Sequence, residues 1–362
     1  MNALFIANLE LKETEGIYKK ICAQSDAVEK VVGHCNLITR RGDKAVLKEY
    51  LENKQEELNN DFFDYISQQI LSAEMDLIYV RHMIPNFRLI SVLKNAKNQG
   101  VKIFYEIPTY PYFGEQFKAS RKKYRAVVKI GLDLIFWPLI YHYIDKLVII
   151  RSNSKSHHFK KMIEITNGVK TEDIKSKDYS GVNYKKVFSM VTVGTLYPYH
   201  GYDRVLEGLA ACNERVEGVT VEFHIVGSSQ TIDELHAMAD KLKLHHVIFH
   251  GTKTTEELNC MYDSFDVGLG CLALHRRNAD IDTTLKVIEY LCRGVPVVTS
   301  GQTPLKHFNN CTIKVIDNDY PLSIEDIFSK YNKISLEVKK SISELAKSKF
   351  SWISIMRKAL EE

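Results

Sequence analysis

Short apolar runs alternate with helical patterns along the whole chain, and this alternation constrains the fold more than any other feature. Continuous apolar runs of this length are typical of buried parallel strands. They fall at residues 3–7, 76–80, 101–105, 147–150, 188–193, 221–226, 247–249, 266–269 and 295–298. Helical patterns lie between them, at residues 86–99, 203–213, 231–243 and 255–263. The alternation predicts βαβ units, and therefore doubly wound α/β domains.

The length of the chain predicts two such domains. A single hydrophobic core usually stops growing at about 250–300 residues, and this chain has 362. The segment 171–181 is polar and lacks periodicity, so we expect the linker there. The first domain is then expected at residues 1–180 and the second at residues 187–349.

Composition indicates a globular enzyme of a reducing compartment. The net charge of +4 is small, which argues against a dedicated nucleic-acid binder. The seven cysteines include no Cys-x-x-Cys pair, so neither a zinc site nor a disulfide framework is expected. The N-terminus reads as a first strand and not as a signal peptide. The most apolar stretch, residues 130–150, contains Asp133, Asp145 and Lys146, so it is not expected to span a bilayer. We expect a cytoplasmic protein.

The segment 281–298 carries the clearest functional signal. Thr283 and Thr284 suit the start of a helix, where free amides and a partial positive charge favour phosphate. Glu289 lies about one and a half turns into that helix, and Gly294 permits the left-handed conformation that ends it. A nucleotide diphosphate would fit, with phosphates on the amides and ribose hydroxyls on the acid. The alternative is an ordinary helix-to-strand unit.

Loops after three strands of the second half add to this signal. Glycines follow each strand, at Gly194, Gly227 and Gly251, and parallel sheets bind ligands at this edge. Arg204 could bind a phosphate through two nitrogens, or form a surface ion pair with a neighbouring acid. His200 could donate to a phosphate oxygen, or be a plain loop histidine.

The second half resembles the retaining family 4 glycosyltransferases of the GT-B fold. The matching elements are Val193-Gly194, His200–Arg204, Phe249-x-Gly251, Glu256–Leu258 before Tyr262, Phe265–Leu269 and Leu285–Val298. In the first half, Gly16, Glu106–Tyr112 and Thr166–Val169 match more loosely, and Glu106–Tyr112 is similar to the capsule and exopolysaccharide branch. The resemblance implies two Rossmann-like domains facing a cleft, with a C-terminal helix at about 350–362 crossing back to the first domain.

The resemblance also implies an activity. A sugar would move from a nucleotide-diphosphate sugar, a UDP-sugar foremost, to a saccharide or polyprenyl-linked saccharide acceptor, with retention of configuration. No cofactor and no required divalent ion is expected. The donor site would comprise Gly194, Thr195, His200, Gly227, Gly251, Lys253, Asp282, Thr283, Thr284, Leu285 and Glu289.

The chain departs from the family pattern at the diphosphate. The family usually has two acids eight residues apart, and Ile281 stands where the first belongs. Asp280 and Asp282 are the neighbouring alternatives. Thr195 and His200 replace the usual Arg and Lys, so Arg204 and Lys286 are expected to supply the missing charge and to stabilise the leaving group.

The acceptor side is expected in the first half, at Gly16, Tyr110 and Tyr112. Glu106 either orients the sugar or takes up the acceptor's proton, or it only holds the Pro108–Pro111 loop. The stretch 121–140 begins with basic residues and continues with aromatic ones, which suits an anionic membrane surface or a solvated helix face followed by core.

Two other functions remain open from sequence. A nucleotide-sugar epimerase of similar architecture would act without an acceptor. A scaffold protein with a degenerate site would bind no nucleotide.

Overall fold

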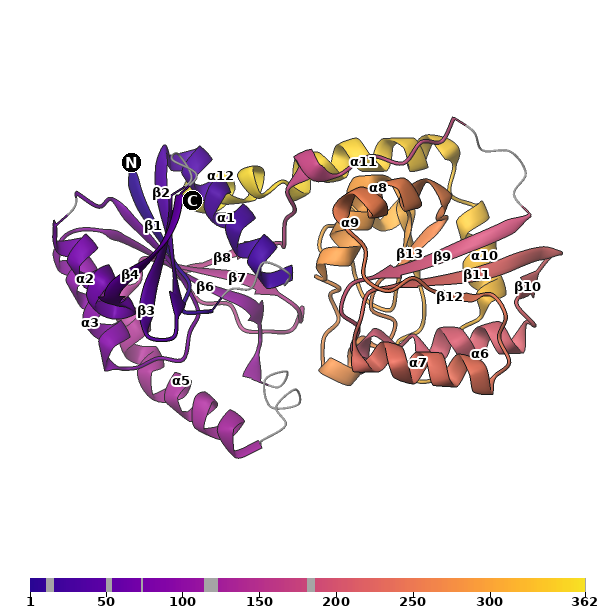
Figure 1. The fold of residues 1–362 in the computed structure, drawn as a ribbon, viewed down its shortest axis with the longest axis horizontal. Coiled ribbons are helices and arrows are strands. Elements are labelled where there is room, and N and C mark those ends of the chain that lie inside the picture. Colours follow the sequence, from indigo (N-terminus) through magenta and orange to yellow (C-terminus); the bar gives the residue numbers. More distant parts are fainter. Residues whose placement is uncertain (11–15, 50–53, 73, 114–122, 181–185, 362) are drawn as a thin grey trace. The chain divides into compact units, whose positions relative to one another are not determined.

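The chain forms two compact units, which the computed structural model describes over residues 1–10, 16–49, 54–72, 74–113, 123–180 and 186–361 (Figure 1). The first unit comprises Met1–Arg151, Lys155–Gly168 and Trp352–Glu362. The second comprises Ser152–Ser154 and Val169–Ser351. Each unit has its own sheet, covered by helices on both faces.

The sheet of the first unit has eight strands in the order β4-β3-β2-β1-β5-β6-β7-β8. Strands β2, β1, β5, β6, β7 and β8 are parallel to one another. Strands β3 and β4 complete the sheet beside β2, and each pairs antiparallel with its neighbours. The strands are β1 (Asn2–Ile6), β2 (His34–Arg41), β3 (Lys44–Glu49), β4 (Lys54–Asp61), β5 (Leu77–Arg81), β6 (Lys102–Tyr110), β7 (Lys146–Arg151) and β8 (Met162–Ile165). The apolar-run pattern missed β2, β3, β4 and β8. Strand β4 has no buried residue, so no apolar run marks it.

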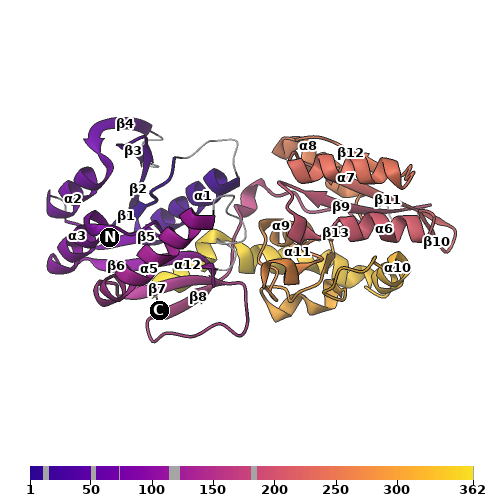
Figure 2. The ribbon, with the colours of Figure 1, turned by 90° about the horizontal axis from the view of Figure 1, so that it is seen from below.

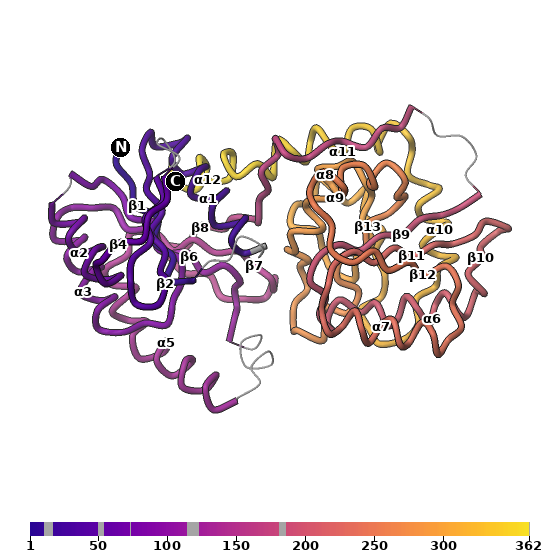
Figure 3. The backbone as a smooth tube through the Cα atoms, in the orientation of Figure 1, coloured from indigo at the N-terminus to yellow at the C-terminus, as the bar shows by residue number. Residues whose placement is uncertain are grey.

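Helices cover both faces of this sheet (Figures 1 and 2). They are α1 (Gly16–Val32), α2 (Phe62–Ser72), α3 (Phe87–Asn98), α5 (Lys123–Tyr143) and α12 (Trp352–Glu361). Helices α1 and α12 share a core on one face, and α2, α3 and α5 share a core on the other. The tube in Figure 3 follows the last helix, α12, to its place beside α1. Trp352 begins α12 and is buried in that core.

The sheet of the second unit has the order β10-β11-β9-β13-β14-β15, with β12 also paired to β11. Its strands are β9 (Val187–Val193), β10 (Arg215–Val216), β11 (Val219–Val226), β12 (Val247–Phe249), β13 (Val267–Leu269), β14 (Val297–Thr299) and β15 (Thr312–Lys314). Its helices are α6 (Asp203–Ala211), α7 (Gln230–Lys241), α8 (Thr255–Met261), α9 (Leu285–Arg293), α10 (Ile324–Asn332) and α11 (Leu336–Phe350). Strands β9, β11, β12, β13, β14 and β15 are all parallel.

The expected linker packs on the second unit. Lys177 donates to the carbonyl of Phe265, the Tyr179 hydroxyl donates to the carbonyl of Gly294 at 2.7 Å, and Ile174 joins a core with α9 and α11. The units therefore divide at residues 168 and 169, earlier than the polar segment suggested. Its last residue, Gly181, lies outside the described residues.

Candidate functional site

Three glycine loops meet at the carboxyl edge of the second sheet. Gly194, Gly227 and Gly251 follow β9, β11 and β12, and all three have positive φ. The amide of Gly194 donates to Val226 and that of Gly227 donates to Gly251, at 2.9 and 2.8 Å. A Cβ added at Gly227 would lie 2.2 Å from the carbonyl oxygen of Gly194. Only glycine allows these loops to approach so closely.

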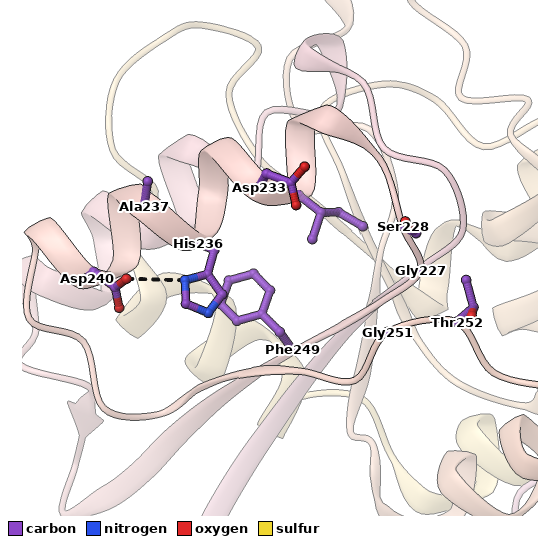
Figure 4. Close-up of a pocket in the computed structure, with 10 residues that line it drawn as sticks. Gly227, Ser228, Asp233, His236, Ala237, Asp240, Phe249, Gly251 and Thr252 are labelled. Carbon is purple, nitrogen blue, oxygen red and sulfur yellow. Dashed lines mark hydrogen bonds and ion pairs between the residues drawn. The ribbon is translucent and has the colours of Figure 1, made fainter.

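A cavity of about 640 Å³ opens beside these loops (Figure 4). Helix α7 forms one wall, and Gly227 and Gly251 lie on the other side. The His236 ring packs 4.5 Å from the Phe249 ring and bonds to Asp240 at 3.2 Å. The cavity is also lined by Ser228, Ile232, Asp233, Ala237 and Thr252. Sequence reasoning identified the two glycines and missed the α7 residues, because nothing in a helix pattern marks which face meets a cavity.

The start of α9 differs from the expected threonine cap. The Thr284 hydroxyl donates to Oδ1 of Asp282 at 2.7 Å, and it does not cap the helix. Asp282 is fully buried and also accepts from the Cys271 amide and the Thr299 hydroxyl, at 2.6 and 2.9 Å. Asp282 therefore ties the loop to the ends of β13 and β14. Without such a cap, the first amides of α9 suit an anion.

Lys286 is buried in the first turn of α9. Its Nζ lies 3.2 Å from the Tyr202 hydroxyl and 3.5 Å from the Thr192 hydroxyl, at the end of β9. Burial, with a smaller contribution from nearby Arg277, lowers the pKa of Lys286 to about 8. Glu289 follows on the next turn, so it lies on the same side of the helix. Its carboxylate is partly exposed, 3.9 Å from the buried guanidinium of Arg293.

His200 and Arg277 complete a cationic cluster around Lys286. Nδ1 of His200 accepts from the Tyr197 amide at 3.0 Å, which leaves the proton of the neutral ring on Nε2. Burial, and then the charges of Lys286 and Arg277, hold the pKa of His200 well below its usual value. Arg277 lies over the Tyr199 ring at 5.0 Å. Sequence reasoning missed Arg277, although a pair of arginines soon after the strand at 266–269 was a signal.

Arg204 does not join this cluster. Its buried guanidinium donates to the carbonyls of Leu272, Ile316 and Tyr320 and to Oδ1 of Asn318. These acceptors engage Nε and both terminal nitrogens. Arg204 was expected to bind the diphosphate. In the structure it instead connects α6 to the loop that follows β15.

Both acids that neighbour the missing first acid bond to other groups of the second unit. Asp280 accepts the amide and the hydroxyl of Ser154, and Asp282 is engaged as described above. Ile281 forms a bridge with Gln302. Of the other expected donor residues, Thr195 is exposed, Thr283 is buried, Leu285 is partly buried, and Lys253 pairs with Glu257 at 3.1 Å.

In the first unit, Glu106 is the centre of a buried polar network. Its Oε2 accepts from Gln24 at 2.5 Å and from the Tyr79 hydroxyl at 2.8 Å, and its Oε1 accepts from Arg81 at 3.2 Å. Its side chain is fully buried. The carboxylate therefore holds Arg81 and Tyr79, which fits neither an exposed base nor a residue that fixes the Pro108–Pro111 loop.

Lys20 lies beside this network, on α1. Its Nζ donates to Oδ1 of Asn167 at 2.6 Å. Burial, then the charge of Arg81, lowers the pKa of Lys20 to about 7, against the opposing effect of Glu106. Neither Lys20 nor Arg81 was expected from sequence, because they are far apart in the chain and belong to no local motif.

The expected acceptor tyrosines take different places. Tyr112 bonds to Asp133, and its ring lies 4.7 Å from His82. Burial raises the pKa of Asp133 to about 6 and lowers the pKa of His82 to about 4. Tyr110 instead packs 6.4 Å from Phe159. Gly16 is the first residue of α1.

Comparison with known proteins agrees with this architecture. Residues 188–315 match the family model of group 1 glycosyl transferases, which confirms the expected resemblance. No curated protein matches the chain by sequence. Among solved structures, WaaG, a glycosyltransferase involved in lipopolysaccharide biosynthesis, is 13% identical, with a TM-score of 0.64 over 99% of this chain and 98% of that chain.

Two further structures agree. Trehalose-6-phosphate synthase OtsA is 11% identical, with a TM-score of 0.63 over 100% of this chain and 99% of that chain. The catalytic domain of starch synthase IV from Arabidopsis thaliana is 11% identical, with a TM-score of 0.62 over 99% and 98%. The chain has the GT-B glycosyltransferase fold, as expected, and the family match supports glycosyl transfer from a nucleotide sugar. Among the described residues, no three His, Cys, Asp or Glu side chains form a group that could hold a metal.

Proposed function

We propose that the protein transfers a sugar, with retention of configuration, from a UDP-sugar or related donor to a saccharide or polyprenyl-linked saccharide in the cytoplasm. We place this activity in the synthesis of a surface polysaccharide. The observation that carries the proposal is the cluster of Lys286, Arg277 and His200 beside the uncapped start of α9.

The cluster suits the charge that develops during transfer. When the sugar leaves, negative charge builds on the nucleotide diphosphate. Lys286, Arg277, the Nε2 proton of His200 and the amides of α9 would stabilise that charge more in the transition state than in the ground state. No Lewis-acid metal is required in this proposal, so chelation should leave the rate unchanged.

The remaining donor contacts follow from the neighbouring groups. Glu289 would accept the two ribose hydroxyls from its place on the next turn of α9. The cavity between α7 and the glycine loops would hold the base, with the Phe249 and His236 rings offering flat apolar faces. The Gly227 backbone, which touches both this cavity and Gly194, would lie along the nucleoside.

On the first unit, Arg81 and Lys20 would contact the acceptor or the transferring sugar, and Glu106 would act as a positioning residue through Arg81. Tyr110 remains the proposed acceptor residue. Tyr112 is engaged by Asp133, so we assign it to support of this region.

A panel of nucleotide sugars tests the function. Thermal shift identifies the donor, because a ligand that binds only the folded state raises the melting temperature. Transfer to saccharide acceptors is then followed with and without a chelator, and proton NMR assigns the anomeric configuration of the product. Conversion of the nucleotide sugar without acceptor would indicate an epimerase, and the absence of any nucleotide binding would indicate a scaffold.

A pair of variants tests the site. Lys286→Ala should lower turnover at least ten-fold in a stably folded protein, since a charged hydrogen bond contributes about 1.5–3 kcal/mol. Arg204→Ala should mainly lower stability, because it removes four hydrogen bonds, one of them buried and three partly buried. Normal turnover in Lys286→Ala would reject the cluster as the diphosphate site.

A further inference from the structure

Helix α5 exposes an apolar face that has no counterpart elsewhere in the described chain. Its core side is formed by Ala126, Asp133, Phe136 and Ile140. The opposite side carries six large, solvent-exposed side chains: Tyr124, Val127, Val128, Leu134, Ile135 and Leu139. Ile135 is 70% exposed and Leu134 is 59% exposed. A helix on the surface of a water-soluble domain normally presents charged and polar residues on that side.

The apolar face continues beyond the helix. Phe87, the first residue of α3, is 80% exposed, and its ring meets the Phe136 ring edge to face at 5.1 Å. Ile84 is exposed three residues earlier. Contiguous apolar surface of this kind marks a docking site, whereas single exposed apolar residues are normal.

The positive charges of α5 lie in its amino-terminal half. Lys123 and Arg125 are exposed at the amino end, Lys129 is partly exposed, and Asp133, the helix's one acid, is buried and bonded to Tyr112. An apolar face flanked by positive charge complements a bilayer with anionic headgroups.

The helix is also long and apolar enough to cross a membrane, the one described helix that is so. At 21 residues it would extend about 30 Å. Its core side, however, packs into the same hydrophobic cluster as α2, α3 and the sheet. A helix held in this way can lie in the headgroup layer but cannot leave the fold to span the bilayer.

We propose that the outward face of α5, with Phe87, is a docking surface for an anionic phospholipid bilayer. The helix lies along the membrane surface with its apolar side chains among the acyl chains and its basic end among the headgroups. This surface goes beyond the proposed transfer reaction and does not depend on it, because vesicle binding needs neither donor nor acceptor.

The full chain is tested by flotation with vesicles of phosphatidylcholine alone or mixed with phosphatidylglycerol. We expect binding to the anionic vesicles, and weaker binding to them at high salt because the basic contribution is screened. The double variant Leu134→Glu/Ile135→Glu should bind at least ten-fold more weakly, since each inserted apolar side chain contributes roughly ten-fold. Leu71→Glu on α2 is the matched control, because Leu71 is 60% exposed in the same unit. It should bind like wild type.

A second double variant, Val127→Glu/Val128→Glu, alters the same face about two turns away. Circular dichroism establishes that each variant is folded. Equal vesicle binding by wild type and both folded double variants would overturn the proposal, as would no binding by wild type. Resistance to alkaline carbonate would show a spanning helix instead. Loss of a dimer in the variants, with vesicle binding unchanged, would assign the face to a second copy of the chain.

Discussion

Each unit places a lysine of lowered pKa beside the carboxyl ends of its parallel strands, but the side chains around the two lysines differ. Lys20, with a pKa of about 7, lies next to Arg81 and the buried Glu106. Lys286, with a pKa of about 8, lies next to Arg277 and His200, while nearby Asp282 is engaged by backbone and hydroxyl donors. In the first unit a buried carboxylate pairs directly with a cation, whereas Asp282 in the second bonds to uncharged donors. The second is therefore the better anion site, and the first the better rigid support.

The largest expected effect tests the buried ion pair between Arg81 and Glu106 in the first unit. Glu106→Ala removes the only described hydrogen-bond partner of Arg81 and leaves its charge buried. Breaking a buried ion pair from one side costs about 3–5 kcal/mol, so we expect the free energy of unfolding to fall by that order. Urea unfolding measures it.

Glu106→Gln is the matched control. It keeps an acceptor for Gln24 and Tyr79 and should lose less stability than the alanine variant. If Glu106→Ala remained as stable as wild type while catalysis disappeared, Glu106 would act directly in the chemistry and the two units would not differ as described.

The next largest effect is expected on donor affinity, which we assign to the second unit. Glu289→Ala should weaken the donor by about 1.5–3 kcal/mol, the value of hydrogen bonds to a charged group, with little change in stability because the carboxylate is partly exposed. Calorimetry with the preferred nucleotide measures the affinity. Glu256→Ala, an exposed acid on α8, is the control and should bind normally. Unchanged affinity in folded Glu289→Ala would remove the acid from the donor site.

The different predictability of the two units has a physical reason. In the second unit, the site residues Lys286 and Glu289 share one short helix, so their spacing in the sequence is enough to place them on the same side. In the first unit, Lys20, Arg81 and Glu106 come from three elements far apart in sequence. Their meeting depends on strand order, which a single sequence does not reveal.

Contacts between distant parts of the sequence also explain why the structure places Arg204 and Arg277 differently from the sequence-based prediction. Arg204 has the right residue type at the start of a helix, yet its side chain turns to carbonyls that lie more than sixty residues away in sequence. Arg277 has no motif around it, yet the loop after β13 brings it to Lys286. Most of the central strands were recognised by their apolar runs, whereas β4, an edge strand with no buried residue, was not.

A smaller effect concerns pH. Because burial lowers the pKa of Lys286 to about 8, the lysine is mostly protonated at pH 7 and mostly neutral at pH 9. An anionic diphosphate binds the protonated form, so donor affinity should fall about ten-fold between these values, and binding should take up protons above pH 8. Calorimetry in buffers of different ionisation enthalpy detects that uptake. Lys286→Arg keeps its charge and should give a flat profile, whereas an equally steep profile would assign the titration to another group.

The smallest effect distinguishes two tyrosines of the first unit. Tyr110→Ala should raise the acceptor's KM about five-fold, the value of one hydrogen bond of about 1 kcal/mol, and leave nucleotide affinity unchanged. Tyr112→Phe should instead affect stability, because it removes the hydroxyl that bonds to buried Asp133. Steady-state kinetics with each substrate varied separately, together with urea unfolding, separates the two. A selective rise in the donor's KM for Tyr110→Ala would assign this loop to the donor side, and the division into an acceptor unit and a donor unit would then fail at this position.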